Sequence, residues 1–363
     1  MIELRCTPAD GRPTTVRIGT GSLENGVPAV AAERLPGRRT AIVADRKIAA
    51  AAGCDDSAGG APSSTLLVDA GEGIKTFEGL EGVLRSLVRA GFDRRSVLVA
   101  VGGGSVGDAV GLAAALLLRG VDLVSVPTTL LAMVDSSVGG KTAINLPEGK
   151  NLVGAYWPAS EVWIDTDFLA TLPEDEWRSG LGEVLKVAIG LDPDLFEHCE
   201  QHVGPLLARD AAAIEVAIAR AVAAKIRVVE EDPREAGARR LLNLGHTLGH
   251  ALEMASDFSI PHGVAVARGL HHAIDVARAQ RTVEPADAER MRKLLAAFGF
   301  EPHPLPEHSA LSAFLGRDKK VVDGQLHAVL PTGIGRSATF CMKPDAFLTP
   351  RSKRGRGLRV DLL

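Results

Sequence analysis

Short apolar runs alternate with amphipathic segments through the first half of the chain. Apolar runs predict strands at residues 40–44, 63–68, 96–101 and 122–126, and apolar positions at helical spacing predict helices at residues 77–90 and 108–118. Residues 1–38 are typical of short strands with a turn at 9–13, and residues 52–62 of a surface loop. Strands that alternate with helices form a parallel sheet covered on both faces, so we expect an α/β fold here.

A helical periodicity replaces this alternation after about residue 165. It predicts helices at residues 174–189, 192–207, 211–231, 248–256, 263–280 and 286–298. A chain of 363 residues is also too long for one simple core. The pattern therefore predicts two domains: an α/β nucleotide-binding domain with a parallel sheet at residues 1–165, and an all-α domain at residues 166–363.

The net charge and the cysteine spacing indicate which binding partners and which cellular compartment suit the chain. A formal net charge of −4 and a pI near 6.2 disfavour nucleic acid and anionic membranes, so an anionic substrate would need a local cluster of Lys and Arg. The four cysteines are scattered, which is typical of free thiols in a reducing compartment. We expect no signal peptide, because residues 1–6 show no basic region followed by an apolar core, and the longest apolar stretch, residues 112–118, is far short of the roughly 20 residues of a membrane span. We expect a cytoplasmic protein with a solvated basic tail from Pro350 onward.

A glycine-rich loop follows the strand predicted at residues 96–101. Gly102, Gly104 and Gly107 fit G-x-G-x-x-G between a strand and a helix, where glycines let the backbone approach a pyrophosphate. A tight turn without a ligand is the plainer interpretation. The loop does not follow the first strand, as it does in the usual dinucleotide fold, so Asp45, at the end of an earlier strand, is the better candidate for the adenosine ribose.

A second group of candidate ligands lies between residues 127 and 151. Thr128 and Thr129 follow a predicted strand, and Lys141 follows two glycines directly. Such a lysine often holds a phosphate or a substrate oxyanion, and Asn151 adds an amide nearby. The plainer alternative is a glycine turn with a surface lysine.

Glu183, His246, His250 and His262 suggest a metal site. One carboxylate with two or three imidazoles is a plausible ligand set for zinc, and His246 and His250 would share one helix face. Glu183 could equally form a helix salt bridge to Lys186, and the histidines could be structural. Lys225, Glu235 and Arg239 precede the His246 helix, and cations near a metal would suit a substrate with both a carboxylate and a phosphate.

Further short motifs lie in order between about residues 40 and 335. They include Asp69-Ala-Gly-Glu-Gly-Ile-Lys75, Leu118-Arg-Gly120, Pro127-Thr-Thr129, Asp135-Ser-Ser-Val-Gly-Gly-Lys-Thr142, Gly149-Lys-Asn151, Thr171-Leu-Pro173, Gly180-Leu-Gly-Glu183, the segment from Asn243 to His250, His262-Gly and Asp318-Lys-Lys320. With the glycine loop, this set closely resembles the 3-dehydroquinate synthase family of sugar-phosphate cyclases.

The resemblance implies a role for each matching residue. A divalent metal, zinc or cobalt, would be bound by Glu183, His246 and His262. NAD would lie against Asp45, Glu72, Lys75, Gly102, Gly103, Gly104, Ser105, Val106, Asp108, Thr128, Thr129, Lys150, Phe168, Thr171, Leu172 and Glu176. Phosphate would be held by Lys141, Asn151, Asn243 and Lys319 or Lys320, with Arg119 from a partner subunit of a homodimer, and the carboxylate by Lys225 and Arg239. The catalytic set would be His250 as proton relay, Lys186 and Asp135 at ring hydroxyls, and Glu235.

The implied reaction converts 3-deoxy-D-arabino-heptulosonate 7-phosphate to 3-dehydroquinate and phosphate, by transient oxidation with NAD, elimination, re-reduction and intramolecular aldol closure. A sibling cyclase of secondary metabolism, of the amino-dehydroquinate type, is one alternative. A metal-dependent polyol dehydrogenase and a non-catalytic homologue are others. One departure stands out: the family usually has Glu two residues after the third metal ligand, where this chain has Val264. If that Glu supports the ligands, its absence would weaken metal binding about 10–100-fold.

Overall fold

The computed structural model describes residues 1–9, 11–54, 63–304, 321–322 and 325–349, and it divides into two compact units. The first unit comprises Met1–Leu172 with Lys225–Pro233, and the second comprises Pro173–Ala224 with Arg234–Leu363. The division expected between residues 165 and 166 stays a prediction about folding units.

A seven-stranded sheet forms the centre of the first unit. Its strands are β1 (Ile2–Cys6), β2 (Thr14–Gly19), β3 (Thr40–Asp45), β4 (Ser63–Val68), β5 (Val97–Gly102), β6 (Asp122–Pro127) and β9 (Glu161–Asp165), in the spatial order β1-β2-β9-β6-β5-β3-β4. All neighbours are parallel except β1 and β2. Every residue of β3 and β5 is buried, because helices cover both faces and no position along these strands faces water.

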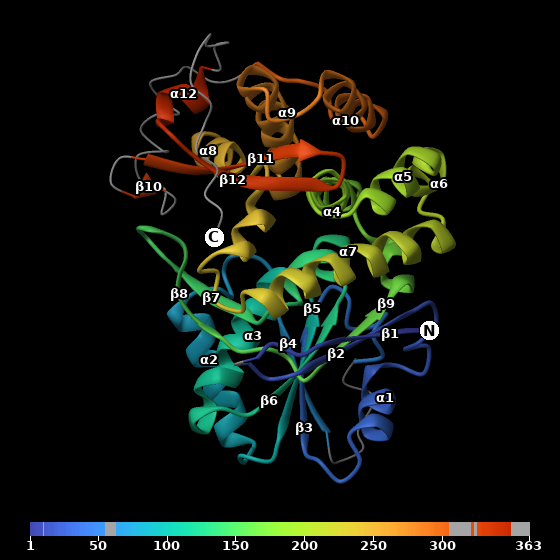
Figure 1. Ribbon diagram of the computed structural model, residues 1–363. Coiled ribbons are helices and arrows are strands. Elements are labelled where there is room, and N and C mark those ends of the chain that lie inside the picture. The colour runs from blue at the N-terminus through green and yellow to red at the C-terminus, as the bar shows by residue number, and fades with distance from the viewer. Residues whose placement is uncertain (10, 55–62, 305–320, 323–324, 350–363) are drawn as a thin grey trace. The chain divides into compact units, whose positions relative to one another are not determined.

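Helices lie on both faces of this sheet (Figure 1). On one face α1 (Val27–Arg34) packs on alternate residues of β3, β5 and β6, including Ile42, Val99 and Val124. On the other face lie α3 (Gly104–Leu116) and α2 (Phe77–Arg89). Because the central strands are parallel, Asp45, Gly102, Pro127 and Asp165 end their strands at one edge, where open α/β sheets bind ligands.

Smaller elements complete the first unit. These are η1 (Leu117–Arg119), η2 (Ala132–Ser136), η3 (Thr166–Thr171) and the hairpin of β7 (Lys141–Leu146) with β8 (Gly149–Tyr156). Strand β7 packs against α3. The sequence patterns predicted neither this hairpin nor α1.

The second unit is mainly helical. It contains α4 (Glu174–Gly190), α5 (Pro193–Gln201), α6 (Val203–Leu207), η4 (Ala238–Asn243), α8 (His246–Ala255), α9 (His262–Gln280), α10 (Pro285–Ala297) and α12 (Pro344–Leu348), and α7 (Ala211–Glu231) passes from the second unit into the first after Ala224. The helix predicted at 192–207 is broken at His202 into α5 and α6.

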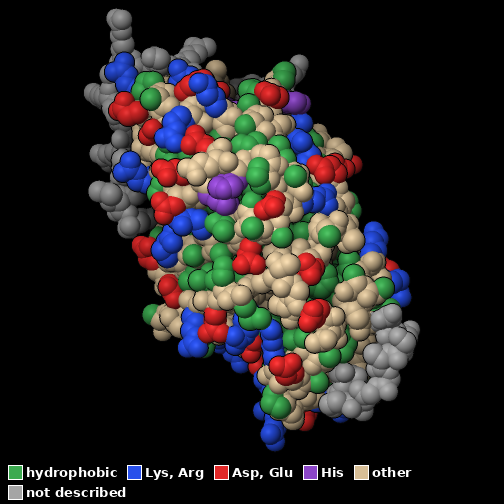
Figure 2. All heavy atoms as spheres, turned by 90° about the vertical axis from the view of Figure 1, so that its right-hand side faces the viewer, with side chains coloured by type: hydrophobic (Ala, Val, Ile, Leu, Met, Phe, Trp, Pro, Cys, Tyr) green, Lys and Arg blue, Asp and Glu red, His purple; other side chains and the backbone are tan. Residues whose placement is uncertain are grey.

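The fold class expected from the sequence is confirmed, with one correction to the second domain. The description all-α is incomplete, because β10 (Val321–Val322), β11 (Gln325–Gly333) and β12 (Arg336–Met342) form an antiparallel sheet there. Strand β11 packs against α9, so helix packing rather than a long alternating pattern stabilises this sheet. Within the described residues, no helix has the length and apolar character needed to cross a membrane. On the face shown in Figure 2, acidic and basic side chains are interspersed.

Candidate functional site

The glycine loop of the first unit lies directly between β5 and α3, and its backbone is closely packed. A Cβ on Gly102 would lie 2.8 Å from Cβ of Val106, and one on Gly103 would lie 3.1 Å from Cγ2 of Thr129. Helix α3 begins at Gly104, earlier than predicted, and no side chain caps its N-terminus. A close backbone turn leading into an uncapped helix N-terminus fits a pyrophosphate.

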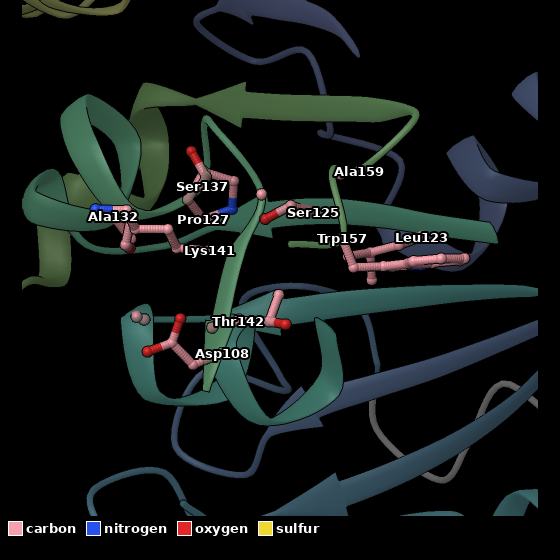
Figure 3. Close-up of a pocket in the computed structure, with 16 residues that line it drawn as sticks. Asp108, Leu123, Ser125, Pro127, Ala132, Ser137, Lys141, Thr142, Trp157 and Ala159 are labelled. Atoms are coloured by element: carbon pink, nitrogen blue, oxygen red, sulfur yellow. The ribbon is translucent and has the colours of Figure 1, made fainter. Parts of the chain in front are cut away.

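A hollow opens beside this loop (Figure 3). It encloses about 410 Å³ of empty space, including open solvent, and its lining residues are Gly102, Gly103, Gly104, Gly107, Asp108, Leu123, Ser125, Pro127, Ala132, Ser136, Ser137, Gly140, Lys141, Thr142, Trp157 and Ala159. Lys141 and Asp108 were predicted site residues. Ser136 and Trp157 were not, although Ser136 lies in the motif that runs from Asp135 to Thr142.

The buried amine of Lys75 forms hydrogen bonds with a predicted cofactor residue and a predicted substrate residue. Its Nζ donates to Oδ2 of Asp108 at 2.6 Å and to Oδ1 of Asn151 at 2.5 Å. Burial raises the pKa of Asp108, although the Lys75 ammonium opposes the shift. Glu72 joins the cluster through Asn145, which donates to its Oε2 and accepts at Oδ1 from the backbone N of Asn151 at 2.9 Å. Nζ of Lys150 lies 3.9 Å from Oε1 of Glu72. Residues far apart in the sequence therefore form one polar group beside the glycine loop.

Other predicted cofactor residues of this unit lie at strand ends. The buried Asp45 ends β3, and its Oδ1 accepts from the backbone N of Lys47 at 3.1 Å. Oγ1 of Thr129 accepts from the backbone N of Ala132 at 3.2 Å. Oγ of Ser105 does not cap α3, and it accepts from the backbone N of Gly71 at 3.0 Å. Thr128 is buried after β6, while Phe168, Thr171 and Leu172 lie in or directly after η3, which follows β9.

Two residues expected to contact substrate contact one another. Nζ of Lys225 lies 2.6 Å from Oδ1 of Asp135 and donates to the Asp135 backbone carbonyl at 2.5 Å. The amine is buried, and the segment that carries it belongs to the first unit. The pair therefore fixes the Asp135 loop.

In the second unit, three helices approach closely at glycines next to the predicted metal ligands. A Cβ on Gly182 in α4 would lie 2.1 Å from the carbonyl O of Gly263 in α9, and one on Gly269 would lie 1.9 Å from the carbonyl O of Gly245. Only glycines permit these backbone contacts. Each glycine pair includes a neighbour of Glu183, His246 or His262 in the sequence, so the contacts bring the three ligands together.

The three predicted metal ligands form one cluster, in which Glu183 and His246 are buried and His262 is half-buried. Oε1 of Glu183 lies 3.5 Å from Nε2 of His246 and 3.4 Å from Nε2 of His262. Their candidate ligand atoms all lie within 4.8 Å of one another. One carboxylate and two imidazoles, with a further position left for water or substrate, is the donor set of a catalytic zinc site. The residues present therefore fit the metal that the resemblance implies.

A hydrogen bond orients His246, and an ion pair holds Glu183. Nδ1 of His246 lies 3.2 Å from the carbonyl O of Leu244, which can only accept, so Nδ1 carries the proton and Nε2 is left to bind metal. Nζ of Lys186 lies 3.0 Å from Oε2 of Glu183, and both side chains are buried. The ion pair foreseen as the plainer interpretation of Glu183 thus exists, and it lies beside the two histidines.

Two carboxylates set the electrostatics at His262. Burial alone would lower the pKa of His262, but the carboxylates of Glu183 and Glu253 outweigh it and raise this pKa to about 10. Nδ1 of His262 lies 3.1 Å from Oε2 of Glu253. Sequence reasoning missed Glu253, although it lies three residues after His250 and could have been found as a further carboxylate on that helix.

The remaining predicted residues occupy several places. His250 lies beside the cluster, with its ring centroid 5.3 Å from that of His246 and 5.9 Å from that of His262. Asn243 donates to Oε1 of Glu235 at 2.8 Å, and Arg239 is buried in η4. Glu176 lies in the first turn of α4 and Arg119 ends η1, while Lys319 and Lys320 lie outside the described residues.

Family models match most of the chain. The model described as 3-dehydroquinate synthase N-terminal matches residues 65–179, and the one described as 3-dehydroquinate synthase C-terminal matches residues 180–321. The chain belongs to the 3-dehydroquinate synthase family. A 3-dehydroquinate synthase of Rhodospirillum rubrum is 48% identical over 289 residues, covering 77% of this chain and 75% of that protein. One of Xanthomonas campestris pv. campestris is 42% identical over 351 residues, covering 92% and 94%.

Solved structures of related cyclases share the fold of this 3-dehydroquinate synthase family member. A 2-deoxy-scyllo-inosose synthase, solved with carbaglucose-6-phosphate, NAD+ and Co2+, has a TM-score of 0.84 at 28% identity, covering 96% of this chain and 98% of that one. A 2-epi-5-epi-valiolone synthase from Streptomyces hygroscopicus subsp. jinggangensis, solved with NAD+ and Zn2+, has a TM-score of 0.82 at 29% identity, covering 95% and 97%. NAD and a divalent metal therefore accompany this fold in both.

Proposed function

We propose that Glu183, His246 and His262 hold a divalent metal and that the Gly102–Gly104 loop holds NAD in a 3-dehydroquinate synthase. The enzyme converts 3-deoxy-D-arabino-heptulosonate 7-phosphate to 3-dehydroquinate and phosphate. The observation that carries the proposal is the Glu183–His246–His262 cluster, whose His246 tautomer leaves Nε2 for a metal. NAD supplies transient removal and return of a hydride, and the metal polarises the carbinol oxygen.

The chain's own residues exchange a proton with the substrate hydroxyl and hold the polar side chains of the site in position. His250 lies one helical turn from His246 and can exchange a proton with the reacting hydroxyl. Lys186 holds the Glu183 carboxylate in place and can present its remaining protons to a ring hydroxyl. Glu235 orients the amide of Asn243. Supported carboxylate and amine groups of this kind keep the catalytic residues positioned before substrate arrives.

Cations and amides of the chain suit a doubly anionic substrate. Lys141 lines the hollow beside the glycine loop, and we assign it to the phosphate with Asn151 and Asn243. Lys225 and Arg239 are assigned to the carboxylate. Lys225 already pairs with Asp135, so a bound carboxylate would share this ammonium rather than meet an isolated charge. Lys319 and Lys320 keep their predicted phosphate role as part of the proposal.

A homodimer in which Arg119 serves the partner subunit belongs to the same proposal. Leu118, Arg119 and Gly120 are three consecutive residues with positive φ, of 51°, 67° and 121°. Non-glycine residues rarely adopt this conformation, and such strain gathers at functional sites. The side chains of Leu116 and Leu118 are exposed beside Arg119, which supports an apolar contact there. A cytoplasmic location is also proposed, because all four cysteines are free.

The decisive test measures phosphate release from the heptulosonate phosphate with catalytic NAD while NADH absorbance is followed. We expect release that a chelator abolishes and added Zn2+ restores, without net NADH, because the cofactor returns its hydride in each turnover. The variant Glu183→Gln should lose this activity, whereas Glu289→Gln, on the exposed face of α10, should retain it. Release from a different sugar phosphate only would identify a sibling cyclase, and steady NADH accumulation on simple polyols would identify a dehydrogenase. Either result contradicts the proposal.

A further inference from the structure

Each of the three proposed metal ligands forms a hydrogen bond or ion pair with a different neighbouring group. Glu183 is held by the ammonium of Lys186, and His246 by the backbone carbonyl of Leu244. His262 alone is held by a second carboxylate, that of Glu253. The Glu253 side chain is 11% exposed, and its Oε2 lies 3.1 Å from Nδ1 of His262 while Nε2 of the same ring faces Glu183.

Helix geometry explains why Glu253 can reach this ring. His246 and Glu253 are seven residues apart on α8, so they share one helix face. That face packs against α9, which begins at His262. The carboxylate can only accept, so a neutral His262 held by it carries its proton on Nδ1 and directs the Nε2 lone pair toward the other ligands.

The position where the family usually has Glu does not share this geometry. Val264 lies two residues after His262 on α9, which places it about 200° around the helix axis from His262. Residues two apart on a helix do not face each other. A carboxylate at position 264 would therefore extend away from the His262 ring, whose Nδ1 is already bound to Glu253.

We propose that Glu253 is the positioning residue of the third metal ligand, and that position 264 does not have this role. The inference rests on the proposed metal site. By accepting from Nδ1, Glu253 fixes the tautomer and the orientation of the His262 ring and increases the basicity of Nε2. Partners of this kind typically change metal affinity about 10–100-fold. The substitution at Val264 then leaves metal affinity intact, contrary to what the sequence alone suggested.

The test measures Zn2+ affinity of the metal-free full-length chain by competition with a chromophoric chelator. We expect Glu253→Ala to weaken binding about 10–100-fold. Glu253→Gln should weaken it less, because the amide oxygen still accepts from Nδ1 while the charge is lost. Val264→Glu and the exposed control Glu289→Gln should change it by no more than about twofold. Co2+ absorption should shift in the Glu253 variants alone, since only they change the ligand orientation.

Four outcomes would overturn the inference. Unchanged Zn2+ affinity in Glu253→Gln and Glu253→Ala, with only a lower melting temperature of the metal-free chain, would make Glu253 a structural residue. Tighter binding in Val264→Glu by tenfold would return the role to position 264. Complete loss of binding in Glu253→Gln with His246→Ala unaffected would place the metal on the alternative group His250, Glu253 and His262. A wild-type chain that binds no Zn2+ would overturn the metal site itself and this inference with it.

Discussion

Gly182 and Gly263 touch backbone to backbone, and each is the sequence neighbour of a metal ligand. A Cβ on Gly182 would lie 2.1 Å from the Gly263 carbonyl O, and a Cβ on Gly263 would lie 1.7 Å from the carbonyl O of Ser179. The backbone N of Gly263 also donates to Oγ of Ser179 at 2.9 Å. The separation of α4 and α9 is thus set by residues without side chains, and the distance between Glu183 and His262 follows from it.

Replacing Gly182 by Ala should therefore separate the two helices. The added methyl group has no flexible neighbour to displace, so we expect a loss of about 3 kcal/mol or more in the free energy of unfolding, together with weakened Zn2+ binding. Gly204→Ala is the matched control in the same unit, because a Cβ there meets nothing within 4 Å. It should be neutral or stabilising by up to about 1 kcal/mol. Denaturant titration with and without Zn2+ measures the free energy of unfolding and its increase on Zn2+ binding. Equal values of these two quantities in the two variants would contradict the prediction.

Lys75→Met should weaken NAD binding while leaving the metal site intact. The substitution removes the ammonium that bonds Asp108 and Asn151 but keeps most of the apolar side chain. Loss of hydrogen bonds to a buried charged group costs about 1.5–3 kcal/mol, so we expect a 10–100-fold rise in the Kd for NAD, measured by calorimetry. Lys293→Met, at an exposed position of α10, is the control. NAD affinity equal to that of wild type in Lys75→Met would refute a role for this cluster.

Acid should destabilise the second unit through buried histidines. Nε2 of His272 lies 2.7 Å from the carbonyl O of Phe347, and burial lowers the pKa of His272. The unfolded chain then binds this proton more readily, so the contribution of His272 to the free energy of unfolding should be flat above about pH 7 and fall as the pH drops through about 6.5. His272→Gln should reduce the slope between pH 7 and pH 5, measured by denaturation with chelator present, whereas exposed His303→Gln should retain it. An unchanged slope in His272→Gln would contradict the assignment of this acid destabilisation to His272.

Mixing two inactive variants tests whether Arg119 acts across a dimer. If Arg119→Ala lacks only the residue that it gives to its partner, a heterodimer with His250→Ala has one intact site. Random exchange of subunits should then restore about a quarter of wild-type phosphate release. Sedimentation confirms that exchange has occurred. Exchange without recovered activity would show that Arg119 serves its own subunit.

Local patterns in the sequence were sufficient for the main elements, whereas the metal-binding role of Glu183, His246 and His262 stays a prediction. The apolar runs of β3 and β5 and the ends of α7 were predicted closely, because buried strands and amphipathic helices carry their own periodicity. The hairpin β7–β8 and the sheet of β11 and β12 were not predicted, since packing against α3 and α9 stabilises them. Two side-chain pairings were also missed: nothing around Asp135 indicates Lys225, and Glu253 was overlooked as the partner of His262 although it lies three residues after His250.

The path of α7 has a consequence for the order in which the chain folds. Lys225–Pro233 belongs to the first unit, although the chain reaches it only after residues of the second unit have been synthesised. The ammonium that binds Asp135 comes from this late segment. During translation, the sheet can form as soon as β9 has left the ribosome. The Asp135 segment acquires its ion pair with Lys225 only after α7 has also left the ribosome. A fragment ending at Leu172 would therefore be an unfinished domain rather than an independent one.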